Sequence, residues 1–211
     1  MFDLDGTITR HDTLLPYVLG FLRSRPWRLA RLIAVLPVLA GFLLGVTDHG
    51  RVKSAFIRAT LGGSPRQELA SWTGRFVSGL RAGGLFAQAL EQISAHQRQG
   101  DRLVLMSAST DLYVPSIARE LGFAQVICTE LRWNGERLGG QLTGPNRRGA
   151  HKACAFRALQ RQYPGLATVA YGNARSDLEH LRLADQAFLV NGSRRARREA
   201  QGAGITCVRW H

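Results

Sequence analysis

The sequence is poor in lysine and cysteine. Lys53 and Lys152 are the only lysines, so arginine supplies all the other positive charges. Three cysteines without a CxxC spacing exclude a disulfide framework and a cysteine-rich zinc site, and they indicate a reducing compartment. The first residues lack a basic stretch followed by an apolar one, so no secretory signal peptide is expected and the chain is predicted to be cytoplasmic.

Acidic residues are also scarce relative to basic ones. The chain of 211 residues has 28 Lys+Arg against 15 Asp+Glu, a formal net charge of +13. Such an excess favours nucleic acid, an anionic membrane or a phosphorylated substrate as partner. No basic motif interleaved with aromatic residues is present, so nucleic acid is not expected. The length and the 45% apolar content predict one core domain with a small insertion.

No apolar run reaches the roughly 20 residues that a membrane-spanning helix needs. The longest, Leu32–Val46, has 15 residues. It is compatible with a buried helix, or with a helical hairpin broken near Pro37. It is equally compatible with a segment that enters a membrane, since Arg23, Arg25, Trp27, Arg28 and Arg31 stand beside it.

The periodicity of apolar residues changes near residue 100. From residue 50 to about 97 the pattern is helical, whereas short apolar runs alternate with helical stretches afterwards, which predicts a parallel sheet with helices on both faces. The predicted strands are 103–106, 167–171, 187–190 and 205–209, and the predicted helices are 113–121, 152–160, 177–183 and 194–201. Asn134-Gly135 predicts a hairpin over 127–142.

Reactive residue types occur at four places after strands or at helix starts. Asp3 and Asp5 stand two residues apart, where one carboxylate can attack and the other can move protons. Gly6 permits a sharp turn, which the Thr7 hydroxyl can help to fix. Alone, this pair could also be a surface turn.

Three further places complete the set. Ser107 follows an apolar strand and, with nearby amides, could hold a phosphate oxygen. Lys152 opens a helix and offers a point charge. Asn173 and Asp177 offer the oxygen ligands that Mg²⁺ prefers. Each alone could be a helix cap or a solvated side chain.

Taken in order, FDLDGT, Ser107, Lys152 and GNARSD resemble the haloacid dehalogenase superfamily of phosphotransferases over nearly the whole chain. The resemblance implies an α/β, Rossmann-like core with a parallel sheet, and a helical C1-type cap inserted after the first strand. We therefore expect residues 1–10 and 98–211 to form the core and residues 11–97 the cap, with the apolar segment at 14–46.

The same resemblance implies roles for the candidate residues. Asp3 would be the nucleophile and Asp5 the general acid/base, with Lys152 stabilising an aspartyl-phosphate. The phosphate-binding set would be Gly6, Thr7, Ser107, Ala108 and Lys152. The Mg²⁺ ligands would be Asp3, the carbonyl of Asp5, Asn173 and Asp177.

Two departures from the family pattern stand out. Asn173 replaces the first aspartate of the common GDxxxD loop, which removes a charge and predicts weaker Mg²⁺ affinity. Only Met1 and Phe2 precede Asp3, so the central strand is expected to be short, as if the chain began a few residues late.

The cap resembles that of the phosphoserine-phosphatase-like branch, and its apolar segment is similar to that of phosphatidylglycerophosphatase C enzymes. The resemblance implies a lipid phosphate such as phosphatidylglycerophosphate as substrate, with the enzyme at the inner face of the plasma membrane. The alternatives are a soluble phosphatase for a small metabolite such as phosphoserine, in which Arg51 or Lys53 meets a carboxylate, and a non-catalytic membrane-binding protein.

Overall fold

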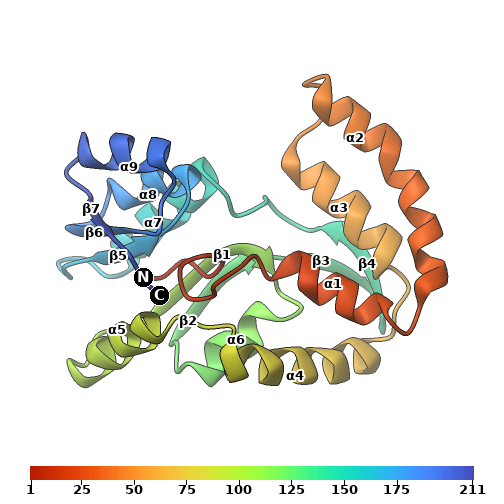
Figure 1. Cartoon of the computed structure of the whole chain (residues 1–211), viewed down its shortest axis with the longest axis horizontal. Helices are drawn as coiled ribbons and strands as arrows, with labels where there is room; N and C mark the ends of the chain where they lie inside the picture. The colour runs from red at the N-terminus through yellow and green to blue at the C-terminus, as the bar shows by residue number, and fades with distance from the viewer.

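The computed structural model describes all 211 residues and has a parallel sheet at its centre (Figure 1). Residues 1–3 lie between its two halves: the amide of Phe2 donates to the carbonyl of Val104 at 2.9 Å, and that of Tyr171 to Met1 at 3.0 Å. The central segment is therefore short but paired on both sides. The strands are β1 (Val104–Thr110), β2 (Gln125–Thr129), β5 (Val169–Gly172), β6 (Gln186–Val190) and β7 (Thr206–Val208), in the order β2–β1–residues 1–3–β5–β6–β7.

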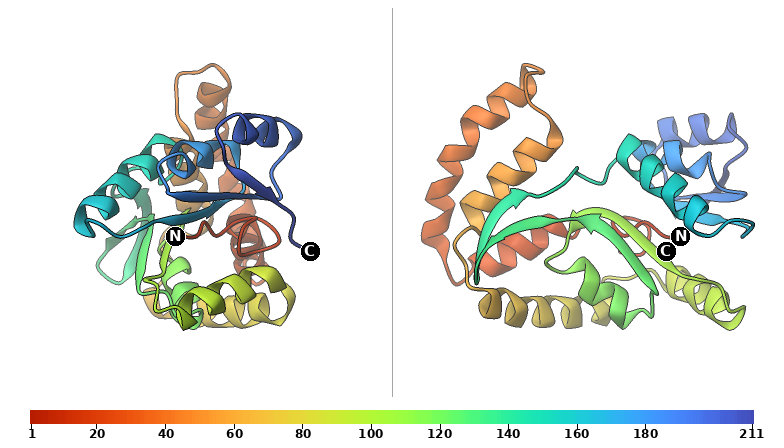
Figure 2. Two further views of the ribbon diagram at one scale, coloured as in Figure 1. Left: turned by 90° about the vertical axis from the view of Figure 1, so that its left-hand side faces the viewer. Right: turned by 180° about the vertical axis from the view of Figure 1, so that it is seen from behind.

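Helices cover both faces of this sheet because its strands are apolar on both sides. Successive residues point to opposite faces: Leu105 packs in one buried cluster and Met106 in the other. One face carries α5 (Ala87–Arg98) and α6 (Val114–Glu120), and the other carries α7 (Ala150–Gln162), η2 (Arg175–Asp177), α8 (Leu178–Leu181) and α9 (Arg194–Gln201) (Figure 2). The predicted α/β fold with a parallel sheet is confirmed.

A second group of helices lies beyond one end of the sheet (Figure 2). It comprises α1 (Leu14–Leu22), the 3₁₀ helix η1 (Pro26–Val35), α2 (Leu36–Leu43), α3 (His49–Thr60) and α4 (Arg66–Gly83). The hairpin of β3 (Leu131–Asn134) and β4 (Arg137–Leu142) joins this group, because the Gly63 amide donates to the Leu138 carbonyl at 2.8 Å.

Aromatic packing connects this group to the sheet domain. The ring of Tyr17 in α1 lies 4.7 Å from that of Tyr113, at the start of α6, and its hydroxyl is 2.8 Å from that of Thr73 in α4. On the sheet itself, His96 of α5 meets the ring of Phe2 edge-on. The division into core and cap at residues 10 and 97 stays a prediction.

Two boundaries differ from the sequence expectation. Residues 127–129 belong to β2, which pairs with β1, so the single hairpin predicted over 127–142 was wrong in its first part. The strand expected to end at Met106 continues to Thr110. Residues 107–110 are mostly polar and gave no strand signal, whereas residues 127–129 were predicted as a strand but with the wrong partner, because β1 is distant in the sequence.

The apolar segment forms an exposed arm, defined here as residues 26–46. Its helices η1 and α2 run up to a turn at Gly45 and back into α3 (Figure 1). Pro26–Leu43 is long and apolar enough, with mean hydropathy 1.5, to be a candidate membrane span, and only 6% of it is buried. Of the two alternatives that the sequence left open, the buried helix is excluded, and the chain reverses near Gly45, not at Pro37.

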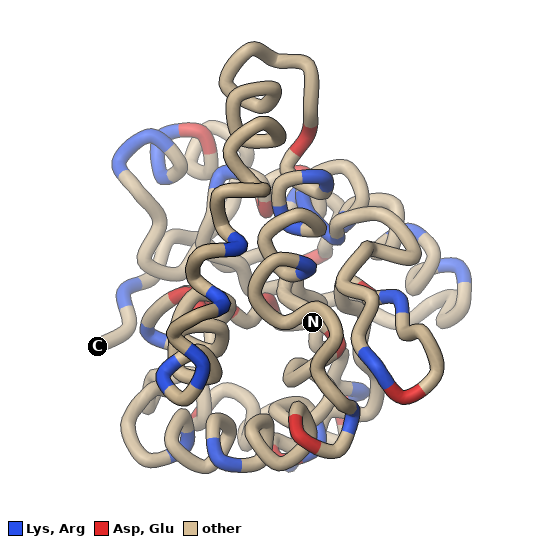
Figure 3. The backbone as a smooth tube through the Cα atoms, turned by 90° about the vertical axis from the view of Figure 1, so that its right-hand side faces the viewer, with Lys and Arg blue, Asp and Glu red and all other residues tan.

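The arm has a charge-free tip. Ile33, Leu43 and Val46 are 70%, 78% and 74% exposed. Figure 3 shows no charged residue along the top of the arm and arginines lower down. This is an apolar surface with a cationic base.

Candidate active site

Every sequence-predicted site residue lies at one end of the sheet, where the parallel strands finish and loops can converge. Asp3 ends the central segment, Lys152 comes from α7 and Asp177 ends η2. These three line a cleft of about 590 Å³ with Asp5, Gly6, Ala108 and Asn173. Residues up to 174 positions apart in the sequence thus meet in one cleft.

Lys152 links two buried carboxylates. Its Nζ lies 2.6 Å from Asp3 Oδ1 and 2.8 Å from Asp177 Oδ1. All three side chains are 7% exposed or less. Buried charges persist only when they are paired and hydrogen-bonded, so this triad fixes the orientation of the Asp3 carboxylate.

Burial and ion pairing shift the pKa values of Asp3, Lys152 and Asp177 in opposite directions. Burial raises the pKa of Asp3 above its ordinary value, although Lys152 opposes the change. Burial would also raise the pKa of Asp177, but Lys152 and the hydrogen bonds of that carboxylate hold it below its ordinary value. Burial would lower the pKa of Lys152, yet the two carboxylates raise it, so the ammonium stays charged.

Asp5 is held by residues that sequence reasoning missed. Its Oδ1 accepts from the amide of Thr13 at 2.7 Å and from the Thr13 hydroxyl at 2.5 Å, and its Oδ2 accepts from Ser109 Oγ at 2.6 Å. Burial raises the pKa of Asp5 despite these bonds. Ser109 stands two residues after Ser107 and therefore on the same side of β1, which is the signal that could have identified it.

Gly6, Thr7 and Asn173 shape the loop around Asp3. Gly6 has φ +76°, a conformation that favours glycine. The buried Thr7 hydroxyl lies 3.4 Å from Asp3 Oδ2. The main-chain N–H of Asn173 donates to Asp177 Oδ2 at 3.2 Å. The three residues thus lie where the sequence placed them, although the Asn173 side chain faces Gly6.

Ser107 and Ala108 lie beside Asp5 on β1. Ser107 is fully buried, with its Oγ 3.4 Å from Asp5 Oδ2 and accepting from the Ser109 amide at 2.9 Å. The Ala108 carbonyl accepts from Lys53 Nζ of α3 at 2.7 Å. Burial lowers the pKa of Lys53 to about 8. The other lysine of the chain therefore reaches the same cleft from α3.

The residues present fit a magnesium ion. The carboxylates of Asp3 and Asp177 bring two negative charges, and Lys152 brings one positive charge. The side chain of Asn173 adds an amide oxygen that can ligate a metal ion. No three His, Cys, Asp or Glu side chains are placed so that they alone could hold a metal ion. Mg²⁺ suits this donor set, because it is held by one or two carboxylates and keeps several water ligands.

Comparison with known proteins identifies relatives of the whole chain. The model of haloacid dehalogenase-like hydrolases matches residues 1–182. A probable phosphatase of Mycobacterium tuberculosis is 28% identical over 213 residues, covering 96% of this chain and 72% of the relative.

Solved structures share the fold. A protein of unknown function from Bordetella pertussis Tohama I superposes with a TM-score of 0.80 at 23% identity, covering 98% of this chain and 96% of the other. A probable phosphoserine phosphatase from Vibrio cholerae superposes with a TM-score of 0.73 at 18% identity, covering 100% of this chain and 60% of the other.

Proposed function

Because the chain belongs to the haloacid dehalogenase-like hydrolase family, we propose that it is a magnesium-dependent phosphomonoester hydrolase that works through an aspartyl-phosphate on Asp3. The observation that carries the proposal is the buried pairing of Lys152 with Asp3 and Asp177. A fixed positive charge beside a nucleophilic carboxylate stabilises the negative charge of a phosphoryl group in transfer.

In the first step Asp3 attacks phosphorus. Lys152 holds Oδ1, which leaves Oδ2 with only the 3.4 Å contact to Thr7. A bond forms between this oxygen and phosphorus as the bond to the leaving alcohol breaks, and Asp5 gives its proton to the alcohol oxygen. Burial raises the pKa of Asp5 above its ordinary value, which favours the protonated form that this step uses.

In the second step water attacks the aspartyl-phosphate. Asp5 takes a proton from the water while the bond between Asp3 and phosphorus breaks, so phosphate leaves and both carboxyls return to their starting states. Thr13 and Ser109 hold Asp5 from two sides, which keeps it aimed at one position through both steps. Bound Mg²⁺, held by Asp3, Asn173, Asp177 and the Asp5 carbonyl, would supply further positive charge.

For the substrate we propose a lipid phosphate. Support comes from the exposed arm, whose Val38 lines a pocket directly beside the catalytic cleft. The apolar tip would lie in the acyl layer and the arginines at its base against anionic headgroups, at the inner face of a membrane. A substrate embedded in that membrane would then have its headgroup near Asp3.

A phosphorylated small metabolite such as phosphoserine is the second candidate. Lys53 favours it, since this ammonium lines the catalytic cleft and could meet a carboxylate of the substrate. The likeness in fold to a probable phosphoserine phosphatase is in keeping with this candidate.

The test is a Mg²⁺-dependent assay of phosphate release with lipid phosphates and small phosphomonoesters. We expect hydrolysis that Asp3→Asn abolishes and that a chelator removes. Metal-dependent hydrolysis retained in Asp3→Asn would sink the proposal.

A further inference from the structure

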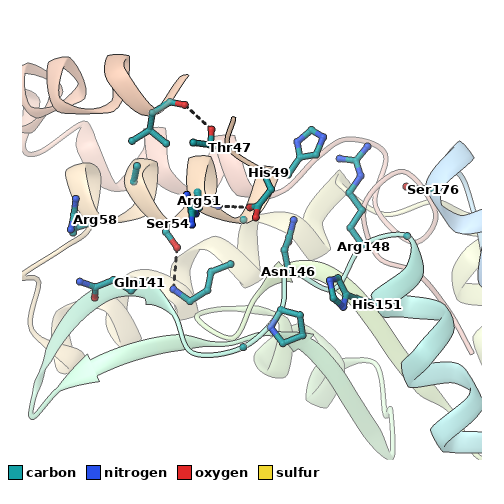
Figure 4. Close-up of a pocket in the computed structure, with 18 residues that line it drawn as sticks. Thr47, His49, Arg51, Ser54, Arg58, Gln141, Asn146, Arg148, His151 and Ser176 are labelled. Carbon is teal, nitrogen blue, oxygen red and sulfur yellow. Dashed lines mark hydrogen bonds between the residues drawn. The ribbon is translucent and has the colours of Figure 1, made fainter. Parts of the chain in front are cut away.

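A second pocket continues from the catalytic cleft. It has a volume of about 770 Å³ and lies between α3 and residues 141–151 (Figure 4). The two cavities have four lining residues in common: His49, Asn146, Arg148 and Ser176. A molecule whose phosphoryl group lies at Asp3 can therefore extend into the second pocket without leaving the protein surface.

Arginines line this pocket from two sides. Arg51, Ser54 and Arg58 are spaced by three, four and seven residues, so they share one face of α3. Arg148 comes from the opposite wall, where the pocket meets the catalytic cleft (Figure 4). A substrate would thus meet positive charge along the whole path from Lys152.

None of these three arginines has an acidic partner. Five arginines of the chain form ion pairs with glutamates, and Arg51, Arg58 and Arg148 are not among them: the five are Arg25, Arg66, Arg81, Arg175 and Arg195.

The only acidic residue of the pocket is already engaged. Asp48 caps α3, since its Oδ1 accepts from the Arg51 amide at 2.8 Å. Unpaired like charges in a concave site repel each other and focus a positive potential. The pocket is therefore suited to an anion.

Resting on the proposed function, we propose that this pocket is a second anion-binding subsite, and that the preferred substrate is a phosphomonoester whose leaving group carries an anionic group of its own. The terminal phosphoryl group lies at Asp3, and the second anion lies among Arg51, Arg58 and Arg148. A carboxylate and a phosphodiester both accept paired hydrogen bonds from a guanidinium. Either group meets the chemistry of the pocket.

The inference is tested with substrate pairs that differ in the second anion. 3-Phosphoglycerate and glycerol 3-phosphate differ by a carboxylate in place of a hydroxymethyl group. Dihexanoyl phosphatidylglycerophosphate and dihexanoyl phosphatidic acid differ by a phosphodiester in the leaving group. We expect the anion-bearing member of one pair to have a kcat/KM about tenfold higher or more, as for a charge-assisted hydrogen bond. The pair that shows the preference identifies the anion as carboxylate or phosphodiester.

Arginine variants test whether the substrate preference arises in this pocket. In Arg51→Gln and Arg148→Gln the ratio of kcat/KM within the favoured pair should fall about tenfold. The matched control is Arg198→Gln, an exposed arginine on α9 outside both cavities, which should keep the ratio of the unaltered protein. Equal kcat/KM within both pairs, or a preference that survives both variants, would overturn the inference.

Binding measured without turnover separates this inference from the proposed function. In Asp3→Asn protein, calorimetry with both members of each pair should show tighter binding of the anion-bearing member, weakened by Arg51→Gln. If the unaltered protein hydrolyses none of the esters, this binding preference would support the subsite and reject the proposed hydrolase. Hydrolysis without any preference in rate or binding would keep the hydrolase and reject the subsite.

Discussion

Gly6 and Asn173 approach so closely that a Cβ atom on Gly6 would stand 2.0 Å from Asn173 Nδ2. Gly6 also has φ +76°. The loop that carries Asp5 and the loop that carries Asp177 are therefore fitted to each other at this contact. The glycine of the FDLDGT segment is thus required by packing as well as by its backbone angle.

Gly6→Ala should accordingly impair activity and stability together. The added methyl group must displace the Asn173 side chain, and the residue must keep a positive φ, at a combined cost of about 1–3 kcal/mol. Urea unfolding and phosphate release measure the two effects. Gly63→Ala, with a similar φ of +78° but nothing within 4 Å, isolates the backbone contribution. Equal losses in both variants would show that the Asn173 contact is unimportant.

Lys152→Met should destabilise the fold by removing the cation between Asp3 and Asp177. Breaking a buried ion pair on one side leaves uncompensated charge and costs about 3–5 kcal/mol. Urea unfolding without metal measures the loss, and added Mg²⁺ should restore part of the stability by binding the native state. An unfolding free energy equal to that of the unaltered protein would contradict the ionic arrangement.

Ser109→Ala should lower kcat with little change in KM, because Ser109 positions Asp5 through the 2.6 Å hydrogen bond. Loss of one such bond to a charged group costs about 1.5–3 kcal/mol, or about tenfold or more in rate. Ser109→Thr, which keeps the hydroxyl, should recover much of the rate. A purely structural role would predict a lower unfolding free energy and no recovery by threonine.

Asn173→Asp should tighten magnesium binding. It restores a negative charge beside Asp3 and Asp177, and we expect the half-activating Mg²⁺ concentration to fall about tenfold, or 1.4 kcal/mol. A magnesium titration of activity measures it. Asn134→Asp at the end of β3 adds the same charge outside the cleft and serves as control. An unchanged half-activating concentration would count against Asn173 as a ligand.

The arm should bind anionic vesicles. Replacing Ile33, Leu36 and Leu43 by serine removes exposed apolar surface from it and should weaken partitioning by tenfold or more, since each buried side chain contributes about 1.5–3 kcal/mol. Flotation with phosphatidylglycerol vesicles measures it, and salt should weaken binding through the arginines. Protein that fails to float with these vesicles would disfavour the lipid-phosphate substrate. Activity on soluble esters should survive the substitutions.

Much of the fold was accessible from sequence because its signals are local. Short apolar runs and helical patterns predicted β5, β6, α7 and α9 near their observed bounds. Residues 127–129 were assigned to the hairpin of Asn134-Gly135, although they pair with β1, because that pairing is a contact between segments distant in the sequence. The sequence did not decide whether the arm is buried or exposed, because an apolar run has the same composition in both cases.

The sequence alone determined which residues are candidates for chemistry, since the spacing of Asp3 and Asp5 and the order of Ser107, Lys152 and Asp177 are local facts of the chain. Only the tertiary structure decided their relationships. It paired Lys152 with two carboxylates, placed Thr13 and Ser109 on Asp5, and left Arg51 and Arg148 without acidic partners. Burial, pairing and charge focusing depend on which distant segments meet, and that is set by the packing of the sheet and its helices.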